Sequence, residues 1–393
     1  MTTTESDAVL DHLDASRPAD EVRAAHAEMR ERCPVVHSPR HGGFDFVGRY
    51  ADVRGALTEP ATFSSADGVF IPPSGLPRVP ALEWDEPEHS KWRAMLEAPL
   101  TPASVRAFEP TLAEIVNLLI DGFAGRGHAD LVAEFAAPLP AIVIGRMVGL
   151  DQRAAVEAAH TADALFESIA TPAFDERMAE FVAFTETQLT ERRREPREDF
   201  LTALAQRQVA GVPIDDAGAA GLLVAYLLGG HHSTSSGVAG LLRHVLVEPG
   251  LREEIEDNER IVPRVVEESL RLTTPLQLFA RTTTCPVDVG GEPVPAGRRV
   301  MLNLAAANRD PREFEDPEQF VPQRKRNRHV AFGAGAHVCQ GQHLARAEMR
   351  IALRELLSRL PDLRVDGEIE QSGLKGGKLM TVSALPVAFT PER

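Results

Sequence analysis

The stretch that decides the fold is Ala331-Phe332-Gly333-Ala334-Gly335-Ala336-His337-Val338-Cys339-Gln340-Gly341, followed by Gln342-His343-Leu344-Ala345-Arg346-Ala347-Glu348. Gly333 and Gly335 permit backbone angles and close approaches that other residues do not. The residues after Gly341 have the apolar spacing of a helix, so Cys339 is expected at or near its start. Unpaired N–H groups and a partial positive charge there favour a thiolate over a thiol. The sequence therefore predicts a thiolate presented by a rigid backbone.

A thiolate in this position could be a nucleophile, a zinc ligand or an iron ligand, and a lone cysteine can also be inert core. No second cysteine lies near Cys339 in the sequence, which argues against zinc, and the c-type haem motif C-x-x-C-H is absent. The pattern F-G-x-G-x-H-x-C-x-G-x-x-L-A-R is complete and closely resembles the haem-thiolate loop of the cytochrome P450 family. The resemblance implies that Cys339 is the axial ligand of a b-type haem, and that Phe332, Gly333, His337 and Gly341 belong to the haem-binding loop.

The bulk composition limits the class of protein. The chain has 393 residues, of which 43% are hydrophobic and 25% charged, an ordinary globular balance. A net charge of −16 argues against nucleic acid and an anionic membrane surface as partners. Residues 1–7 contain neither a basic region nor an apolar run, so we expect no signal peptide and no membrane anchor. Three widely spaced cysteines suit a reducing cytoplasm.

Helical patterns dominate the fold prediction. Residues 102–210 read as successive helices broken at glycines and prolines, whereas residues 34–47 read as a β-hairpin at the edge of a small sheet. Residues 287–304 and 364–389 read as short strands. The resemblance implies one mainly α domain with a small β subdomain, the cytochrome P450 fold, over residues 1–393.

The substrate pocket is expected on segments that lie far apart in the chain. Residues 63–88 form a proline-rich loop, and a loop of this length in a compact domain is usually functional or disordered. The resemblance makes this loop a wall of the substrate pocket, and ordinary core is the other interpretation for the apolar members. The pocket candidates are Val69, Phe70, Leu276, Gln277, Leu278 and Met380.

Histidine and arginine at one-turn spacing open another helix. His89 and Arg93 are four residues apart and therefore share a helix face. From the local sequence alone they could equally be a surface pair. The resemblance implies that both bind haem propionates, together with Arg281 and His337. Propionates are carboxylates, which cationic and hydrogen-bonding groups recognise.

A long helix is expected from Asp215-Asp216, which reads as a cap, to about Glu248. Gly229 and Gly230 are expected to interrupt it, either by admitting a group close to the backbone or by opening a bulge. The resemblance places a dioxygen groove here, where the family has Ala/Gly-Gly-x-Asp/Glu-Thr. This chain has His232 in place of the acid and Ser233 in place of threonine.

The resemblance thus assigns the four residues 229, 230, 232 and 233 to catalysis, with imidazole and hydroxyl handling the proton path. Two adjacent histidines could instead bind a metal. However, positions i and i+1 of a helix are expected to point apart.

An E-x-x-R pair precedes the cysteine loop. Glu268 and Arg271 can pair at i,i+3 spacing, although many surface helices show the same spacing. The resemblance implies that they are locked by an arginine just upstream of the loop, for which Arg324 is the candidate. The run 324–329 is basic within an acidic chain, and it reads either as a solvated loop or as a landing patch for an acidic protein.

The implied function is monooxygenation of a small, mostly apolar organic substrate, a terpenoid or an aromatic compound, by O2. Electrons are expected from a ferredoxin and its NAD(P)H-dependent reductase. The altered segment around His232 leaves open a peroxide-driven enzyme, or one that couples or rearranges its substrate. A non-catalytic haem protein is the remaining alternative. NADH consumption tied to product formation, with a ferredoxin system present, separates the three.

Overall fold

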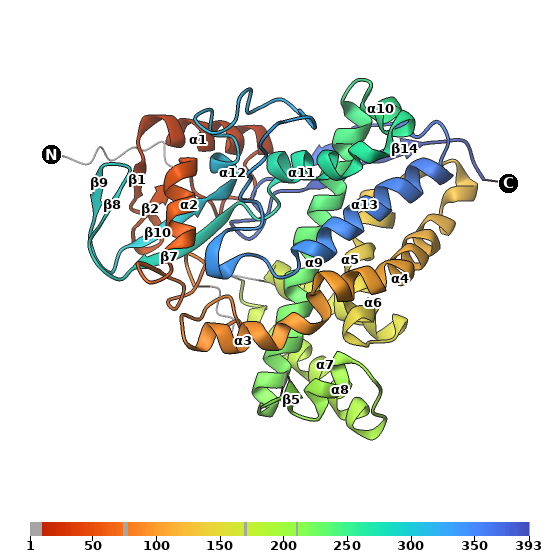
Figure 1. The fold of residues 1–393 in the computed structure, drawn as a ribbon, viewed down its shortest axis with the longest axis horizontal. Helices are drawn as coiled ribbons and strands as arrows, with labels where there is room; N and C mark the ends of the chain where they lie inside the picture. The colour runs from red at the N-terminus through yellow and green to blue at the C-terminus, as the bar shows by residue number, and fades with distance from the viewer. Residues whose placement is uncertain (1–9, 74–77, 169–170, 210, 393) are drawn as a thin grey trace. The chain divides into compact units, whose positions relative to one another are not determined.

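The structure is a computed structural model that describes residues 10–73, 78–168, 171–209 and 211–392, without the side chains of residues 166 and 167. Figure 1 shows its helices and strands. The helices are α1 (Ala19–Arg32), α2 (Tyr50–Thr58), α3 (Glu88–Glu97), α4 (Pro102–Asp121), α5 (Pro138–Val148), α6 (Gln152–Ser168), α7 (Phe174–Arg194), α8 (Phe200–Ala205), α9 (Asp216–Val247), α10 (Leu251–Asp257), α11 (Val262–Thr273), α12 (Leu304–Ala307) and α13 (Gln342–Arg359).

The strands are short by comparison. They are β1 (Val35–Ser38), β2 (Phe44–Val47), β3 (Phe63–Ser64), β4 (His128–Asp130), β5 (Gln208–Val209), β6 (Val212–Pro213), β7 (Leu278–Thr283), β8 (Val287–Val289), β9 (Glu292–Val294), β10 (Arg299–Asn303), β11 (Arg364–Val365), β12 (Glu370–Gln371), β13 (Val382–Ala384) and β14 (Pro386–Ala388). The prediction of a mainly α chain with a small β part is confirmed.

The chain divides into two compact units. The first consists of residues 1–89, 260–339 and 371–381, and the second of residues 90–259, 340–370 and 382–393. The single domain predicted over residues 1–393 stays a prediction.

The first unit is built on a five-stranded sheet with the order β1-β2-β10-β7-β3. The predicted hairpin is present, because β1 pairs antiparallel with β2 and Val36 lies opposite Phe46. Strand β10 then runs parallel to β2 and antiparallel to β7. Phe44 and Phe46 are buried against Leu278 and Met301, so one face of the sheet carries an apolar core.

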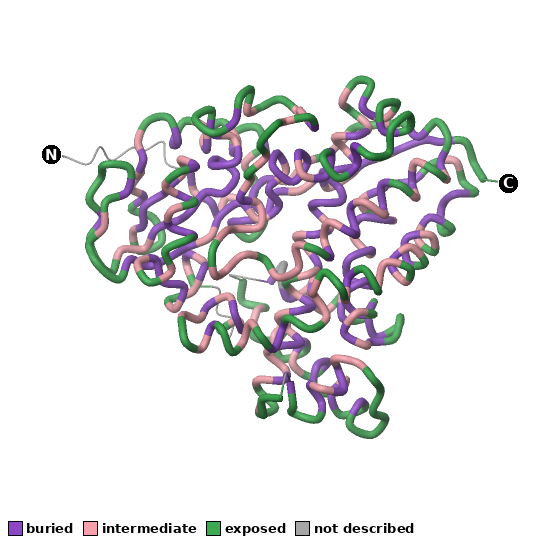
Figure 2. The backbone as a smooth tube through the Cα atoms, in the orientation of Figure 1, coloured by how far each residue is buried: buried purple, intermediate pink, exposed green. Residues whose placement is uncertain are grey.

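The second unit is organised around α9, which packs with α5, α6 and α13 (Figure 1). The Asp215 side chain caps its start by accepting a hydrogen bond from the Gly218 amide at 2.7 Å, as the sequence predicted. Residues 236–242 are all buried. Figure 2 colours buried residues purple. Within the part of the chain that the structure describes, neither α9 nor any other helix is both long and apolar enough to cross a membrane.

The predicted interruption or bulge of this helix is wrong, because α9 continues through Gly229 and Gly230, but the alternative form of the prediction, a group admitted close to the backbone, is confirmed at Gly230. A Cβ added to Gly230 would lie 3.1 Å from the Ile144 side chain of α5, so this glycine allows the two helices to approach closely. A Cβ at Gly229 would meet no described atom within 4 Å outside its own helix. The two glycines therefore differ: one is a packing residue and the other leaves open space beside the helix.

Candidate functional site

The cysteine loop has a backbone that few other sequences could adopt. The Cys339 amide donates to the Phe332 carbonyl oxygen at 2.8 Å, and Gly333 and Gly335 have φ of +71° and +70°. A Cβ on Gly335 would lie 2.5 Å from the Leu57 carbonyl oxygen, which is backbone and not free to move aside. The loop is thereby held against the end of α2.

Cys339 lies just outside the helix that follows it. Helix α13 begins at Gln342, and the Cys339 residue is exposed. None of the three cysteines, all of which the structure describes, is in a disulfide. The structure therefore places Cys339 as an exposed residue on a fixed loop.

A cluster of basic groups lies in the same unit. The His89 and His337 rings are 4.3 Å apart between centroids, and His337 also lies near the Ser65 hydroxyl at 3.5 Å. Burial, followed by the nearby Arg281 and His89, lowers the pKa of His337 to about 4. Burial likewise lowers the pKa of Arg281 to about 10. These groups are therefore crowded together and poorly solvated, which makes their charged forms costly without an anion.

Two groups of this cluster, Arg281 and His89, have no anionic or second acceptor among the described residues for part of their hydrogen-bonding capacity. The Arg281 guanidinium donates to the Ala280 carbonyl oxygen at 2.8 Å, and no carboxylate of the described residues accepts from it. His89 is 3% exposed; its Nδ1 bonds Glu86 at 3.1 Å, and its Nε2 is buried without a partner among the described residues. A bound carboxylate would supply both groups with an acceptor. The cysteine loop predicts a haem, and the residues of this cluster fit the propionates of such a haem.

Arg93 belongs to the second unit and lies one turn after His89 on α3. Its carbonyl oxygen accepts a hydrogen bond from the Gln340 side chain at 2.8 Å, which ties α3 to the residue after the cysteine. Its guanidinium as a propionate ligand stays a prediction.

Glu268 stands at the centre of a buried ion network in the first unit. Arg271 binds its carboxylate through two nitrogens, at 2.7 and 3.0 Å, and both side chains are 0% exposed. Arg324 donates to the same carboxylate at 3.2 Å, and Asn327 donates at 3.0 Å. The network joins α11 to the segment before the cysteine loop, so that it fixes where the loop begins.

The six pocket candidates lie on segments that the first unit brings together. The Ala280 amide donates to Val69 O at 2.8 Å, and the Met380 amide donates to Pro275 O at 3.3 Å. Val69 and Leu278 are 0% and 1% exposed, so both have the burial of core residues. The other four candidates are Phe70, Leu276, Gln277 and Met380. Among the described residues, the Gln277 Oε1 atom is buried without a hydrogen-bond partner.

Lys378 is a buried residue of these segments that sequence reasoning missed. Its ammonium lies 3.2 Å from the centroid of the Phe70 ring, and its carbonyl oxygen accepts from the Gln277 amide at 2.8 Å. Burial lowers the pKa of Lys378 to about 7, against the attraction of Glu83. The sequence offered only a lysine in a glycine-rich turn, which normally indicates solvent exposure.

The α9 residues of the second unit have partners that the sequence did not predict. The Nε2 atoms of His231 and His232 each lie 2.8 Å from Oδ1 of Asp163 on α6. Burial would raise the pKa of the Asp163 carboxyl, but the hydrogen bonds from the two imidazoles hold it well below its ordinary value. Ser233 donates its hydroxyl to the Gly229 carbonyl oxygen at 3.1 Å.

The expectation that adjacent histidines point apart is therefore wrong for the ring nitrogens, because both Nε2 atoms reach the same carboxylate oxygen. Two residues about 100° apart around a helix can reach a common acceptor when a neighbouring helix places it between them. Helix α6 packs against α9 and does so through Asp163. Sequence reasoning missed Asp163 because nothing in the local pattern of α6 marks it.

Comparison with known proteins places the chain in a family. The sequence model described as "Cytochrome P450" matches residues 166–361. The steroid C26-monooxygenase of Mycobacterium tuberculosis is 31% identical over 94% of each chain, and the nocardicin C N-oxygenase of Nocardia uniformis is 35% identical over 94% of this chain and 96% of its own. The solved structure of a mutant of P450 EryK in complex with erythromycin B has a TM-score of 0.85 and 30% identity, covering 96% and 99% of the two chains.

The chain belongs to the cytochrome P450 family. It is a bacterial-type P450 monooxygenase, an oxidoreductase that uses haem iron and O2. The predictions of family, fold and enzyme class from the cysteine loop are thereby confirmed.

Proposed function

We propose that this P450 inserts one oxygen atom of O2 into a small, mostly apolar organic substrate, of the terpenoid or aromatic kind, with electrons from a ferredoxin and its NAD(P)H-dependent reductase. The observation that carries the proposal is the cysteine loop, which Gly335 holds against Leu57. We propose a cytoplasmic location, which the cysteines without disulfides support.

The chain's own residues would bind haem b as follows. Cys339 would ligate the iron, and Phe332, Gly333 and Gly341 would shape the loop around it. The propionates would be held by His89, Arg93, Arg281 and His337. Haem with a thiolate ligand supplies O2 activation, because the thiolate pushes electron density towards the iron and favours O–O cleavage.

We propose a protein-side proton path at residues 229–233. His232 would pass a proton because histidine exchanges protons near neutral pH. Asp163, whose side chain is 44% exposed, connects that imidazole to solvent. Ser233 and the open side of Gly229 would complete the groove, and Gly230 would hold α9 close to α5 beside it. The Ser233 hydroxyl bonds within its own helix, so it must rotate to donate elsewhere.

The reduced protein exposed to carbon monoxide tests the haem ligand. A red-shifted absorption band is expected for thiolate ligation, and Cys339→His should abolish it. A wild-type spectrum like that of a histidine-ligated globin contradicts the assignment.

A second candidate function is a peroxide-driven enzyme, or one that couples or rearranges its substrate. It is favoured by the engagement of both histidines with Asp163 and of Ser233 with Gly229. NADH consumption coupled to product formation, with ferredoxin and reductase present, supports monooxygenation. Product formation from peroxide alone supports the second candidate.

A further inference from the structure

Asp163, His231 and His232 place three metal-ligating side chains around one point in the second unit. Each residue offers one ligand atom, and the three atoms lie within 4.8 Å of one another. The His231 and His232 rings are 4.6 Å apart between centroids, and both Nε2 atoms face the same carboxylate oxygen at 2.8 Å. The family pattern has an acid where His232 stands and leaves the position of His231 open, so His232 is the histidine that departs from that pattern.

The donor set suits a divalent transition metal. Two imidazoles and one carboxylate are ligands that zinc uses with bonds of about 2.0–2.2 Å, which sets neighbouring ligand atoms roughly 3.4 Å apart in a tetrahedron. Each imidazole nitrogen therefore needs to move only about 0.6 Å further from the Asp163 oxygen than its hydrogen-bonded position. The Asp163 side chain is 44% exposed, whereas those of His231 and His232 are 5% and 16% exposed. A metal would enter from the aspartate side and keep one position for water.

The electrostatics of the cluster also favour a cation. Among the described residues, Asp163 is bonded by the two imidazoles and by no lysine or arginine. A divalent ion would therefore meet two imidazoles and a carboxylate to which no lysine or arginine of the described residues is bonded.

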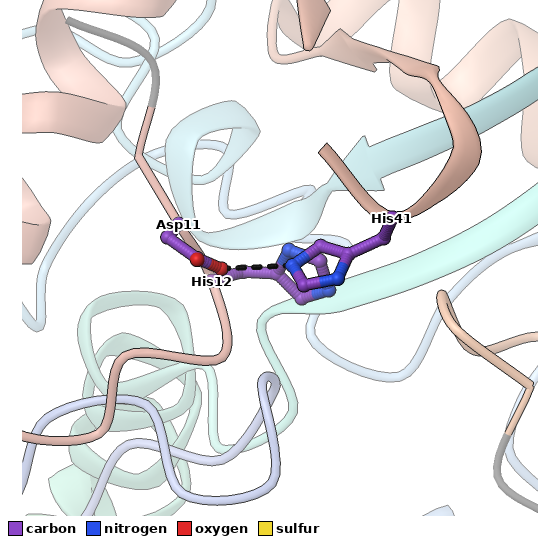
Figure 3. A group of neighbouring side chains, drawn as sticks. All are labelled: Asp11, His12 and His41. Carbon is purple, nitrogen blue, oxygen red and sulfur yellow. Dashed lines mark hydrogen bonds and ion pairs between the residues drawn. The ribbon is translucent and has the colours of Figure 1, made fainter. Parts of the chain in front are cut away.

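A second group with one aspartate and two histidines is less suited to bind a metal. Asp11, His12 and His41 also gather three ligand atoms (Figure 3). There, however, His12 Nε2 bonds the Ile71 carbonyl oxygen at 2.5 Å, and Arg40 lies 3.3 Å from the Asp11 carboxylate. A metal would have to compete with a guanidinium for that carboxylate. This group serves as a comparison for the experiment.

We propose that Asp163, His231 and His232 form a zinc-class metal site that ties α6 to α9. Metal binding replaces the two hydrogen bonds to Asp163 and takes both imidazoles as neutral ligands. It therefore fixes the distance between the two helices. If His232 relays protons as proposed above, the metal also removes the relay, so zinc would inhibit turnover. That consequence depends on the proposed function, whereas the binding itself does not.

Zinc binding to the purified haem-loaded enzyme is the test, measured by equilibrium dialysis with metal analysis and by calorimetry. One Zn²⁺ per chain is expected at this site. Loss of an outer partner of a metal ligand already weakens binding 10–100-fold, so Asp163→Asn and His232→Gln should each weaken it at least about 100-fold. Because Asp163 is partly exposed, its asparagine variant should keep its haem spectrum and melting temperature.

His41→Gln is the matched control, because it removes one imidazole from the group around Asp11. It should leave the affinity at the proposed site unchanged. The proposal is overturned if no stoichiometric zinc binds, or if Asp163→Asn and His232→Gln keep wild-type affinity. It is also overturned if the single site is lost in His41→Gln. Inhibition by zinc without binding loss in Asp163→Asn would likewise contradict it.

Discussion

Gly335 faces the Leu57 carbonyl oxygen so closely that a Cβ would lie 2.5 Å from it, and its φ of +70° is one that L side chains rarely adopt. The identity of one glycine therefore fixes how the cysteine loop sits against α2. This contact gives the sharpest test of the loop as the haem-binding element.

Gly335→Ala should abolish or strongly reduce haem loading, because the loop must move away from Leu57 and carry Cys339 with it. The measurement is the haem-to-protein ratio and the carbon monoxide band. Gly297→Ala is the matched control: its φ is +75°, but a Cβ there meets no described atom within 4 Å. It should cost about 1–2 kcal/mol of stability through backbone strain alone and keep the haem. Equal haem loading in both variants would show that the contact is not needed.

Glu268→Ala should leave Arg271 buried without its carboxylate partner. Breaking a buried pair in this way costs about 3–5 kcal/mol, so haem-poor or aggregated protein is expected. Glu267→Ala is the control on the neighbouring position, where the side chain is 30% exposed and bonds His329. Melting temperature and haem content are the measurements. A stable, fully loaded Glu268→Ala protein would refute a structural role for the network.

The basic run before the cysteine loop, residues 324–329, contains both buried-network residues and exposed residues. Arg324 and Asn327 bond Glu268, whereas Lys325 and Arg326 are exposed. If these two side chains attract an acidic ferredoxin, Lys325→Glu plus Arg326→Glu should slow electron transfer and reduce its dependence on salt.

The control for this prediction changes the net charge equally in exposed positions of the second unit, Arg153→Glu plus Arg197→Glu. Stopped-flow reduction at several ionic strengths is the measurement. If the electron-transfer rate does not depend on ionic strength and is the same in both double variants as in wild type, the run is an ordinary solvated loop.

His232→Ala should slow turnover more than it weakens substrate binding, because the proposed role concerns a proton and not the substrate. His232→Asp should restore part of the rate by returning the carboxylate that the family has at this position. Substrate binding is followed by the spectral shift of the haem, and turnover by NADH-coupled product formation. Substrate affinity that collapses while the bound enzyme turns over normally would assign His232 to substrate contact.

Lys378→Met should change stability in a way that depends on pH. The pKa of Lys378 is about 7 in the folded protein, mainly through burial, and about 10.5 when unfolded. Between these values the unfolded chain binds more protons, so the contribution of Lys378 to stability rises with pH. The variant's melting temperature, relative to wild type, should therefore be higher at pH 6.5 than at pH 9.5.

Lys375→Met, at an exposed lysine of the same turn, is the control and should show no such difference. A pH-independent effect of Lys378→Met would mean that this ammonium is solvated and keeps its ordinary pKa.

The sequence by itself determined the elements whose chemistry is local. Glycine spacing and one cysteine specified the loop at residues 331–341, because positive φ and close backbone approach require glycine wherever the chain folds. Asp215 marked the start of α9, since a cap bonds an amide only three residues away. The same motif identified the family and its haem chemistry.

Tertiary structure decided the contacts between residues that are distant in sequence. It made α9 continuous at Gly230, because close packing against Ile144 of α5 holds the helix there against the cost of glycine. It also buried Lys378 and brought Asp163 to two histidines that lie 68 and 69 positions later in the chain. No local sequence pattern encodes such contacts, because they depend on how helices and turns pack. Packing is a property of the whole unit.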